Sequence, residues 1–323
     1  MNRGIRVAPP LLISLILSAG PALAQSMGAA PPGAEPQRPM SPAGVPAPDL
    51  AFGAFQRGYF ATALKEATQR VTDNPEDGAA MTLIGEIYTQ GLAVKKDLVE
   101  AAHWYRLASE RGNREGTFAY GMALLEGKGV PEDKAAAKSY FETAAAEGHA
   151  GAWYNLGVLA LEGNGVVRDY KDAADDFGKA AAGGDVDAMF ALGTMVKAGR
   201  GTPQDLPQAA SLFKAAAGQK HPGAELEYGI MAFNGEGMPK DEALAAKYFL
   251  RAATEGNPVA ANRLARLYAA GRGLPKNLVE AAHWHLLARA KGIADPWLDG
   301  VLASLSPADK AKVNATLQKT LGE

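Results

Sequence analysis

A repeat of 36 residues constrains the fold of this chain most, because it recurs six times between residues 79 and 294 without slipping by a residue. One glycine column reads Gly85, Gly121, Gly157, Gly193 and Gly229, with Ala265 in the last row. A second column reads Gly91, Gly127, Gly163, Gly199, Gly235 and Gly271, and two residues later stand Ala93, Gly129, Gly165, Gly201, Gly237 and Gly273. A period of this length predicts an array of equivalent structural units.

Four further columns carry one type of side chain in nearly every row. A polar column reads Asp97, Asp133, Asp169, Asp205, Asp241 and Asn277. Two alanine columns read Ala101, Ala137, Ala173, Ala209, Ala245, Ala281 and Ala108, Ala144, Ala180, Ala216, Ala252, Ala288. An aromatic column reads Tyr105, Phe141, Phe177, Phe213 and Phe249, with His285 last. The agreement of so many columns indicates that the six rows fold alike.

Each row is predicted to be a helix, a loop of about seven residues and a second helix. Leu83 and Ile87 recur at helical spacing, and Gly91 then stands where a left-handed helix C-cap favours glycine. The Gly-Lys-Gly-Val-Pro segment at 127–131 cannot continue a helix. The polar column stands just before the second helix, where a carboxylate accepts free backbone N–H groups. Two rows also carry both partners of a capping box, and these are Asp97 with Glu100 and Asn277 with Glu280.

The small residues of the columns predict close crossings between helices. Ala101, Tyr105 and Ala108 share one face of the second helix. Gly157 lies in mid-helix, where glycine costs about 1 kcal/mol relative to alanine, so we expect a neighbouring helix to pack against it. The second helices end at Gly112, Gly148, Gly184, Gly256 and Gly292, with Lys220 as the exception. No row can bury its apolar face alone, so the rows are expected to stack into an all-α solenoid.

At these columns the chain resembles the Sel1-like repeat family, a relative of the tetratricopeptide repeat. The row from Ala152 to Gly184 matches the family pattern at Leu156-Gly157, Gly163-Asn164-Gly165-Val166, Asp169, Ala173, Phe177 and Ala180-Ala181. The resemblance covers residues 79–294 and implies a right-handed α-α superhelix of helix–loop–helix repeats. It also implies an adaptor or regulatory role, since related bacterial proteins act in envelope signalling, exopolysaccharide control and host contact.

The sequence outside the repeats divides into four segments. Residues 1–24 join Arg3 and Arg6 to a short apolar run and Ala22-Leu23-Ala24, which is typical of a cleaved secretory signal; an uncleaved membrane anchor is the alternative. The proline-rich residues 25–49 are interpreted as a disordered tether, with a proline-binding partner as the alternative. Residues 50–78 resemble a shorter tetratricopeptide-like half-repeat that caps the array. In residues 295–323, Ser306-Pro307-Ala308-Asp309 starts a C-terminal capping helix.

The composition and motifs favour a protein without catalytic chemistry. The near-neutral net charge of −2 argues against nucleic-acid binding, and the absence of cysteine excludes disulfides and thiolate metal sites. His283 and His285 are two residues apart on a helix and point away from each other, so we expect no shared metal ion. Gly121 to Lys128 has one residue too many for a phosphate loop and follows a helix rather than a strand. We therefore predict no catalytic, cofactor-binding or metal-binding residue.

A strip of apolar side chains on the first helices is the candidate partner-binding groove. Its members are Phe118, Met122, Tyr154, Val158, Phe190, Leu226 and Ile230. If these helices line the inner curve of the solenoid, the strip offers a groove for a peptide or helix. The alternative is that a tight superhelix buries the strip, and the burial of Phe118, Tyr154 and Phe190 would rule the groove out.

The functional prediction is an exported, non-enzymatic scaffold that binds a protein or peptide partner, with regulation of an envelope sensor kinase as one form. The alternative is a carbohydrate- or peptidoglycan-binding solenoid, with Trp104, Trp153 and Tyr154 as candidate contacts. The signal sequence predicts a periplasmic location, or secretion, without a membrane-embedded segment after cleavage. The sequence names neither the partner nor the oligomeric state.

Overall fold

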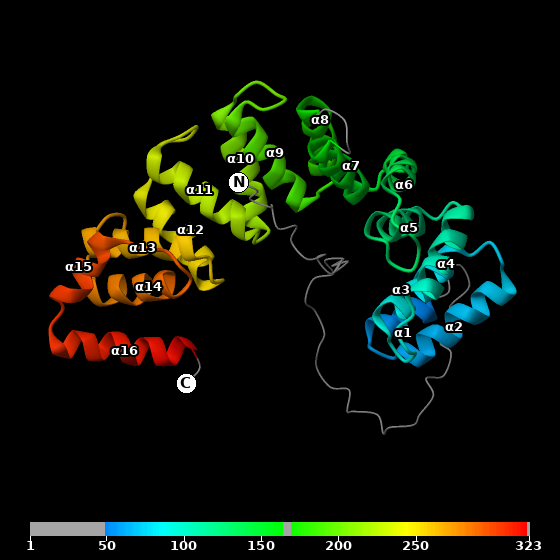
Figure 1. The fold of residues 1–323 in the computed structure, drawn as a ribbon, viewed down its shortest axis with the longest axis horizontal. Coiled ribbons are helices and arrows are strands. Elements are labelled where there is room, and N and C mark those ends of the chain that lie inside the picture. The colour runs from blue at the N-terminus through cyan, green and yellow to red at the C-terminus, as the bar shows by residue number, and fades with distance from the viewer. Residues whose placement is uncertain (1–48, 164–168, 322–323) are drawn as a thin grey trace, which may run out of the picture. The chain divides into compact units, whose positions relative to one another are not determined.

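The computed structural model describes residues 49–163 and 169–321, and in this part of the chain it contains sixteen helices and no strand (Figure 1). The predicted signal at residues 1–24 and the predicted tether up to residue 48 lie outside the described residues. Within them the all-α solenoid prediction is confirmed, because each helix from α2 to α13 packs mainly against the helices before and after it in the chain.

The six rows place helices of equal length in a constant order. Their first helices are α3 (Gly78–Gln90), α5 (Arg114–Glu126), α7 (Ala150–Glu162), α9 (Val186–Ala198), α11 (Pro222–Asn234) and α13 (Pro258–Ala270). Their second helices are α4 (Leu98–Glu110), α6 (Lys134–Ala146), α8 (Tyr170–Ala182), α10 (Leu206–Gly218), α12 (Glu242–Thr254) and α14 (Leu278–Ala290). A shorter pair, α1 (Leu50–Gln56) and α2 (Phe60–Asp73), precedes them, and α15 (Pro296–Ser304) and α16 (Pro307–Leu321) follow.

The helix ends lie where the columns predict them. All six residues of the polar column cap second helices by accepting backbone N–H groups. Gly91 and its equivalents are left-handed C-caps of the first helices. Both predicted capping boxes, at Asp97 and at Asn277, are only half formed, which corrects the prediction: the N–H groups of these two caps donate to the carbonyls of Tyr88 and Tyr268. Glu100 accepts a hydrogen bond from Trp104 Nε1 at 2.8 Å instead of reaching back to the backbone of Asp97.

The core runs along the second helices. Both alanine columns are at most 2% exposed, and the aromatic column is at most 6% exposed. The helical glycines face these rings: a Cβ built on Gly157 would lie 2.8 Å from Cδ1 of Phe177, and one on Gly193 would lie 2.9 Å from Cε1 of Phe213. In the sixth row Ala265 and His285 occupy these two columns, and both are fully buried. The absence of a side chain in the glycine column therefore leaves space for the rings of the aromatic column.

Four of the described loops pack against the row before their own. Gly129 has φ +77°, and a Cβ there would overlap the carbonyl group of Leu98 at the start of α4. Gly201, Gly237 and Gly273 meet the same place in α8, α10 and α12. Ala93 adopts the same left-handed backbone, with φ 61°. It belongs to the first row, which has the short α1–α2 pair before it and not a full row.

The two ends of the array close it differently. Ala63 and Ala67 on α2 are fully buried, as expected of an N-terminal cap. At the other end α16 begins where the sequence predicts, because Ser306 Oγ accepts the N–H of Asp309 at 3.1 Å. The sequence interpretation did not include α15, which packs against α14 and α13 and is capped by Asp295. None of the helices in the described residues is long and apolar enough to cross a membrane.

Candidate functional site

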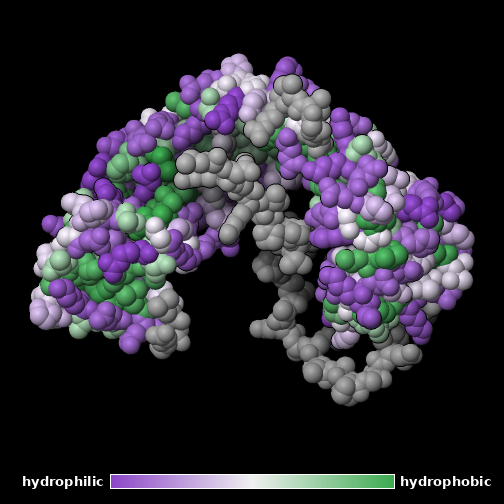
Figure 2. Space-filling model, in the orientation of Figure 1, coloured by the Kyte–Doolittle hydropathy of each residue, from purple (hydrophilic) through white to green (hydrophobic). Residues whose placement is uncertain are grey.

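The predicted groove residues lie on one face of four successive first helices, and we call them the first-helix strip. They are Phe118 and Met122 on α5, Tyr154 and Val158 on α7, Phe190 on α9, and Leu226 and Ile230 on α11. Phe118 is 8% exposed and therefore buried, whereas the other six are half-buried. Six of the seven side chains keep part of their surface exposed, so the groove is not ruled out. They are nevertheless too buried to line an open apolar channel. On the face shown in Figure 2, apolar side chains gather in separate patches.

The aromatic side chains of the core pack against residues of the strip. The ring centroids of Phe118 and Phe141 are 5.8 Å apart, and those of Tyr154 and Phe177 are 5.6 Å apart. Phe190 lies 5.8 Å from Phe213, on the second helix of the same row. These contacts cover the inner side of each strip residue and leave its outer edge at the surface. The strip is therefore a surface whose side chains are held in place by the core.

Histidine rings stack on two of the strip residues. His149 lies 4.1 Å from the ring centroid of Phe118, and His221 lies 4.5 Å from that of Phe190. Both histidines are N-caps, of α7 and α11 respectively, and occupy the position held in the neighbouring row by Asp185. Histidine is an unusual cap, and here its flat ring also covers a phenylalanine. Alternate rows of the strip are thus covered by an imidazole.

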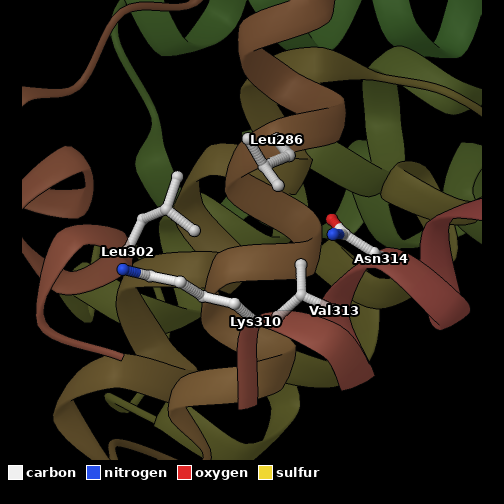
Figure 3. Close-up of a pocket in the computed structure, with 5 residues that line it drawn as sticks. All are labelled: Leu286, Leu302, Lys310, Val313 and Asn314. Atoms are coloured by element: carbon white, nitrogen blue, oxygen red, sulfur yellow. The ribbon is translucent and has the colours of Figure 1, made fainter. Parts of the chain in front are cut away.

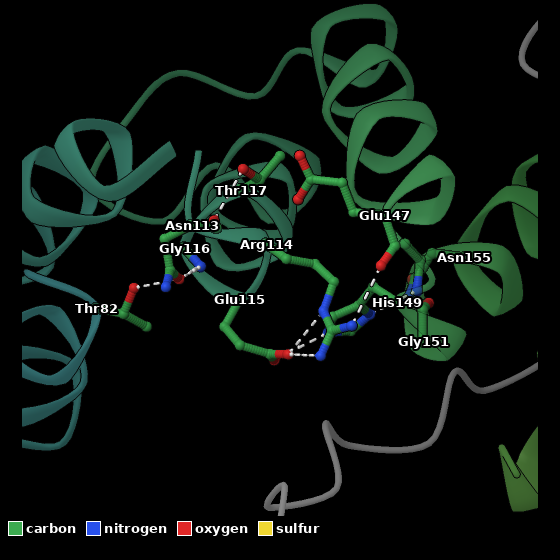
Figure 4. A network of polar contacts seen from close by, with 11 residues as sticks. Thr82, Asn113, Arg114, Glu115, Gly116, Thr117, Glu147, His149, Gly151 and Asn155 are labelled. Carbon is green, nitrogen blue, oxygen red and sulfur yellow. Dashed lines mark hydrogen bonds and ion pairs between the residues drawn. The ribbon is translucent and has the colours of Figure 1, made fainter. Parts of the chain in front are cut away.

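The cap fixes the tautomer of each histidine. Nδ1 of His149 accepts the Ala152 N–H at 3.0 Å, so the proton lies on Nε2, which donates to Glu115 at 3.1 Å (Figure 4). This hydrogen bond is the main reason why the pKa of Glu115 is below its usual value, with Arg114 contributing. Because both ring nitrogens are engaged, the imidazole of His149 offers no free lone pair to act as a general base.

His221 repeats this arrangement two rows later. Nδ1 of His221 accepts the Ala224 N–H at 3.0 Å. Its Nε2 lies 3.2 Å from Asp187. Both pairs therefore serve as fixed polar edges beside the strip.

The remaining histidines are His103, His283 and His285. His283 and His285 are both buried in α14, and His285 Nε2 lies 2.8 Å from Asp299 Oδ1. In residues 49–163 and 169–321, no group of three or more His, Cys, Asp or Glu side chains is placed to hold a metal ion. His103, from the same column as His283, is exposed. The two differ because α15 and α16 pack against α14.

The aromatic residues of the carbohydrate alternative are half-covered. Trp153 has the ammonium group of Lys179 3.8 Å from its ring centroid, and Trp104 donates its indole N–H to Glu100. Tyr154 packs on Phe177. Burial is the main reason that the pKa of Tyr154 is raised. Each of these three rings is therefore already in contact with a neighbouring side chain.

The structure also shows an arginine-rich site that the sequence analysis missed. Its pocket, which we call the arginine pocket, has a volume of about 380 Å³ and lies where α11, α12, α13 and α15 meet. It is lined by Phe233, Phe249, Arg263, Arg266, Leu267, Ala270, Arg272 and Trp297. A signal was present in the columns: Arg266 occupies the position of Met122, Val158 and Ile230 in the strip. At this position the sixth row therefore carries a cation in place of the apolar side chain of the strip.

A smaller pocket of about 290 Å³ lies between α14, α15 and α16 (Figure 3). Leu286, Leu302 and Val313 form its apolar wall, with Lys310 and Asn314 beside them. The ammonium group of Lys310 donates to the carbonyl of Ala303 at 3.1 Å. The pocket therefore has an apolar wall whose one cation is already engaged.

The family model of the Sel1 repeat matches residues 78–113, 115–149, 152–185, 186–221, 222–257 and 258–293. The chain belongs to the Sel1 repeat family. Sel1 repeats typically build scaffolds for protein–protein interaction and are generally not catalytic. Comparison with curated proteins finds no match.

Two solved structures share the Sel1 architecture. A protective antigen of uropathogenic Escherichia coli with an SLR fold is 26% identical, with a TM-score of 0.69 over 79% of this chain. This chain covers 56% of that longer antigen. A Sel1 repeat protein from Oxalobacter formigenes is 28% identical, with a TM-score of 0.62, and the match covers 76% of this chain and 99% of that one.

Proposed function

We propose that this Sel1 repeat protein is an exported scaffold that binds a protein partner across the first-helix strip. The observation that carries the proposal is the continuity of the strip, which places half-buried apolar side chains on the same face of α5, α7, α9 and α11. A surface of this kind is suited to a helix or an extended segment that contacts several rows at once.

The packing below the strip supports its use as a binding surface. Phe118 and Phe190 are each held between a core ring and a stacked histidine. Side chains that are already ordered lose little conformational entropy on binding. The strip is therefore suited to recognise a partner without rearranging.

The location is proposed from the sequence of residues 1–24, which has the composition of a secretory signal. A periplasmic regulator that restrains an envelope sensor protein is the form of the scaffold that we favour, and secretion is the other. Export predicts that the mature protein begins at Gln25. Mass spectrometry of the protein recovered from the periplasmic fraction checks that terminus, and an intact residue 1–24 segment there would contradict it.

Site-specific cross-linking in living cells tests the scaffold proposal. Thr194 lies one turn after Phe190 on α9 and is exposed, so a photo-cross-linking residue there faces any bound partner. Lys214 on the second helix α10 is exposed as well and serves as the matched control. We expect one discrete adduct from Thr194 and none from Lys214. Equal patterns from both positions, or no adduct from Thr194, would reject binding through the strip.

A carbohydrate- or peptidoglycan-binding solenoid is the second candidate. The observation in its favour is Trp297, which is 49% exposed beside the arginine pocket. Sedimentation with purified cell wall separates the candidates. If the wild-type protein sediments with the cell wall and Trp297→Ala does not, the carbohydrate-binding candidate is favoured. If the wild-type protein does not sediment with the wall, the protein partner is favoured.

A further inference from the structure

The arginine pocket is built from the last two rows and the helix α15. Phe233 comes from α11, Phe249 from α12, Arg263 and Arg266 from α13, and Trp297 from α15. Phe233 follows Ile230 of the strip by three residues, so the two lie on neighbouring positions of one helix face. The pocket is therefore the direct continuation of the first-helix strip.

Arg266 is held in a fixed position on one side of the pocket. Its Nε and Nη2 atoms donate to the two oxygens of Asp295 at 2.6 and 2.9 Å. Asn262 donates to the same carboxylate at 2.8 Å, and the guanidinium carbon lies 5.5 Å from the Trp297 ring centroid. Burial alone would raise the pKa of Asp295, but these donors outweigh it and lower the pKa. Among the described residues Nη1 of Arg266 has no partner.

Arg272 is held in the same way on the other side. Its Nε and Nη2 atoms both donate to Glu242 Oε1, and its guanidinium carbon lies 4.4 Å from the ring centroid of Phe233. The hydrogen bond from Arg272, with that from Lys240, lowers the pKa of Glu242 to about 2. Nη1 of Arg272 has no partner within the described part of the chain. Both guanidinium groups thus keep one donor edge available.

Arg263 supplies a cation that no carboxylate neutralises. It is exposed on α13, and no ion pair or hydrogen bond joins its side chain to another described residue. Three arginines line the pocket, and the carboxylates that hold two of them are Asp295 and Glu242. The pocket therefore carries excess positive charge next to Phe233, Leu267 and Trp297.

We propose that the arginine pocket binds a carboxylate side chain of an acidic partner segment whose neighbouring apolar residue lies on the first-helix strip. Guanidinium groups bind carboxylates with two parallel hydrogen bonds, and a guanidinium fixed by a ring and a carboxylate is already oriented to do so. The proposal rests on the proposed function and adds the chemistry of the partner to it.

The surroundings favour a peptide over an acidic sugar. Trp297 and Phe233 each have a guanidinium group over the ring, within the range of a cation–π contact, and that interaction competes with a sugar stacking there. The pocket also opens beside Ile230 and Phe233, which suit an apolar side chain rather than a hydroxylated ring. An acidic segment with interspersed leucines satisfies both parts of this surface.

Fluorescence anisotropy with short labelled peptides on the full chain tests the proposal. The probes are a peptide alternating glutamate and leucine, its glutamine counterpart and its lysine counterpart. We expect the glutamate peptide to bind about tenfold more tightly than the glutamine peptide, as is typical of a hydrogen bond to a charged group. Arg263→Gln should remove most of this difference, and Arg263→Glu should reverse the preference toward the lysine peptide.

The control variant is Arg200→Gln, because Arg200 is also exposed and no described residue pairs with its side chain. It removes the same charge away from the pocket and should leave affinity unchanged. Equal loss in Arg200→Gln and Arg263→Gln, or no loss in Arg263→Gln, overturns the assignment. Binding of oligogalacturonate in place of the glutamate peptide also overturns it and identifies an acidic sugar site.

The cross-linking experiment at Thr194 keeps the two proposals apart. An adduct from Thr194 that persists in Arg263→Glu, with no selective glutamate-peptide binding, rejects the pocket and leaves the scaffold standing. Selective glutamate-peptide binding without an adduct from Thr194 rejects partner binding through the strip. Thermal unfolding confirms that each variant is folded.

Discussion

The helical glycine Gly157 faces the ring of Phe177 so closely that a Cβ on Gly157 would lie 2.8 Å from both Cδ1 and Cε1. Gly121 has the same relation to Phe141, and Gly229 to Phe249. Each glycine weakens its own helix by about 1 kcal/mol relative to alanine, and the buried ring offsets that loss. This contact between the glycine and the phenylalanine ring packs the two helices of a row against each other.

Replacing Gly157 by leucine should destabilise the protein by about 1–3 kcal/mol, because the side chain overpacks the ring of Phe177. The matched control is Gly178→Ala in α8, since no atom lies within 4 Å of a Cβ at that position. That change should stabilise α8 by up to about 1 kcal/mol. Urea unfolding followed by circular dichroism measures both, and unchanged stability of Gly157→Leu would contradict the crossing.

Lys220→Gly should stabilise the protein by about 1 kcal/mol. Lys220 has φ 65° at the turn where Gly184 and Gly256 stand in the adjacent rows, and a left-handed backbone is unfavourable for a residue with a Cβ. Lys220→Ala keeps the Cβ and should give no such gain. A similar gain from both changes would attribute the effect to the lysine side chain rather than to the backbone.

Glu225→Met should leave stability at pH 7 unchanged or raise it by about 1–2 kcal/mol. Glu225 is fully buried on α11, with Oε1 2.5 Å from Arg251 Nη2, and methionine occupies the same column at Met189. Burial raises the pKa of Glu225, and Arg251 opposes the shift only in part. The folded state therefore loses stability as the pH rises above the unfolded value of about 4.3. The benefit of Glu225→Met should be present at pH 7 and shrink toward pH 4.

The control for this pair is Arg251→Met, which leaves the buried carboxylate without its cation. We expect a loss of about 3 kcal/mol at pH 7, and the double variant should recover most of it. If Glu225→Met were as damaging as Arg251→Met, the pair would be a net stabilising contact, and the expected order would be wrong.

His283→Leu should flatten the loss of stability on acidification. Burial lowers the pKa of His283, although Glu280 opposes the shift. Below about pH 6.5 the unfolded histidine takes up a proton that the folded one does not. The free energy of unfolding therefore decreases as the pH is lowered from about 6.5 to the pKa of His283 in the folded state. This residue contributes at most about 1.4 kcal/mol per pH unit. Urea midpoints between pH 7 and 5 measure the slope.

His103→Leu is the matched control for this experiment, because His103 occupies the same column and is exposed. It should leave the acid slope of the wild-type protein unchanged. Identical slopes for His283→Leu and the wild-type protein would show that His283 titrates in the folded state as it does in the unfolded chain.

Much of the fold follows from local chemistry that repeats, and this is why the sequence predicted it. A glycine after an apolar helix face and an aspartate before the next helix satisfy free backbone groups wherever they occur. Gly91 and Asp97 show the pattern in the first row, and it recurs in all six. The strict period then excludes every arrangement in which the rows differ.

Side-chain environments that depend on a neighbour outside the row could not be predicted in this way. Glu100 accepts from Trp104 rather than from the backbone, because the N–H of Asp97 already donates to the carbonyl of Tyr88 on the first helix of the row. The strip depends on how far the next row covers it, which a column does not specify. Phe118 is consequently buried whereas Tyr154 is half-buried.

The arginine pocket needed the structure for a different reason. Its residues come from α11, α12, α13 and α15 and from a loop, and α15 lies outside the repeat. Asp295, which caps α15, also holds Arg266 in the preceding row. Only the tertiary arrangement brings this carboxylate, Trp297 and three arginines together.

Gly129 lets the loop of its row pack against the first turn of the second helix in the preceding row. Gly201, Gly237 and Gly273 do the same. Each of these four loops thus packs against the second helix of the preceding row. Duplication or loss of a whole period leaves each loop with an equivalent neighbour, whereas an insertion of any other length misaligns one of them. In such a chain the number of repeats is free to vary during evolution, while the length of each repeat is not.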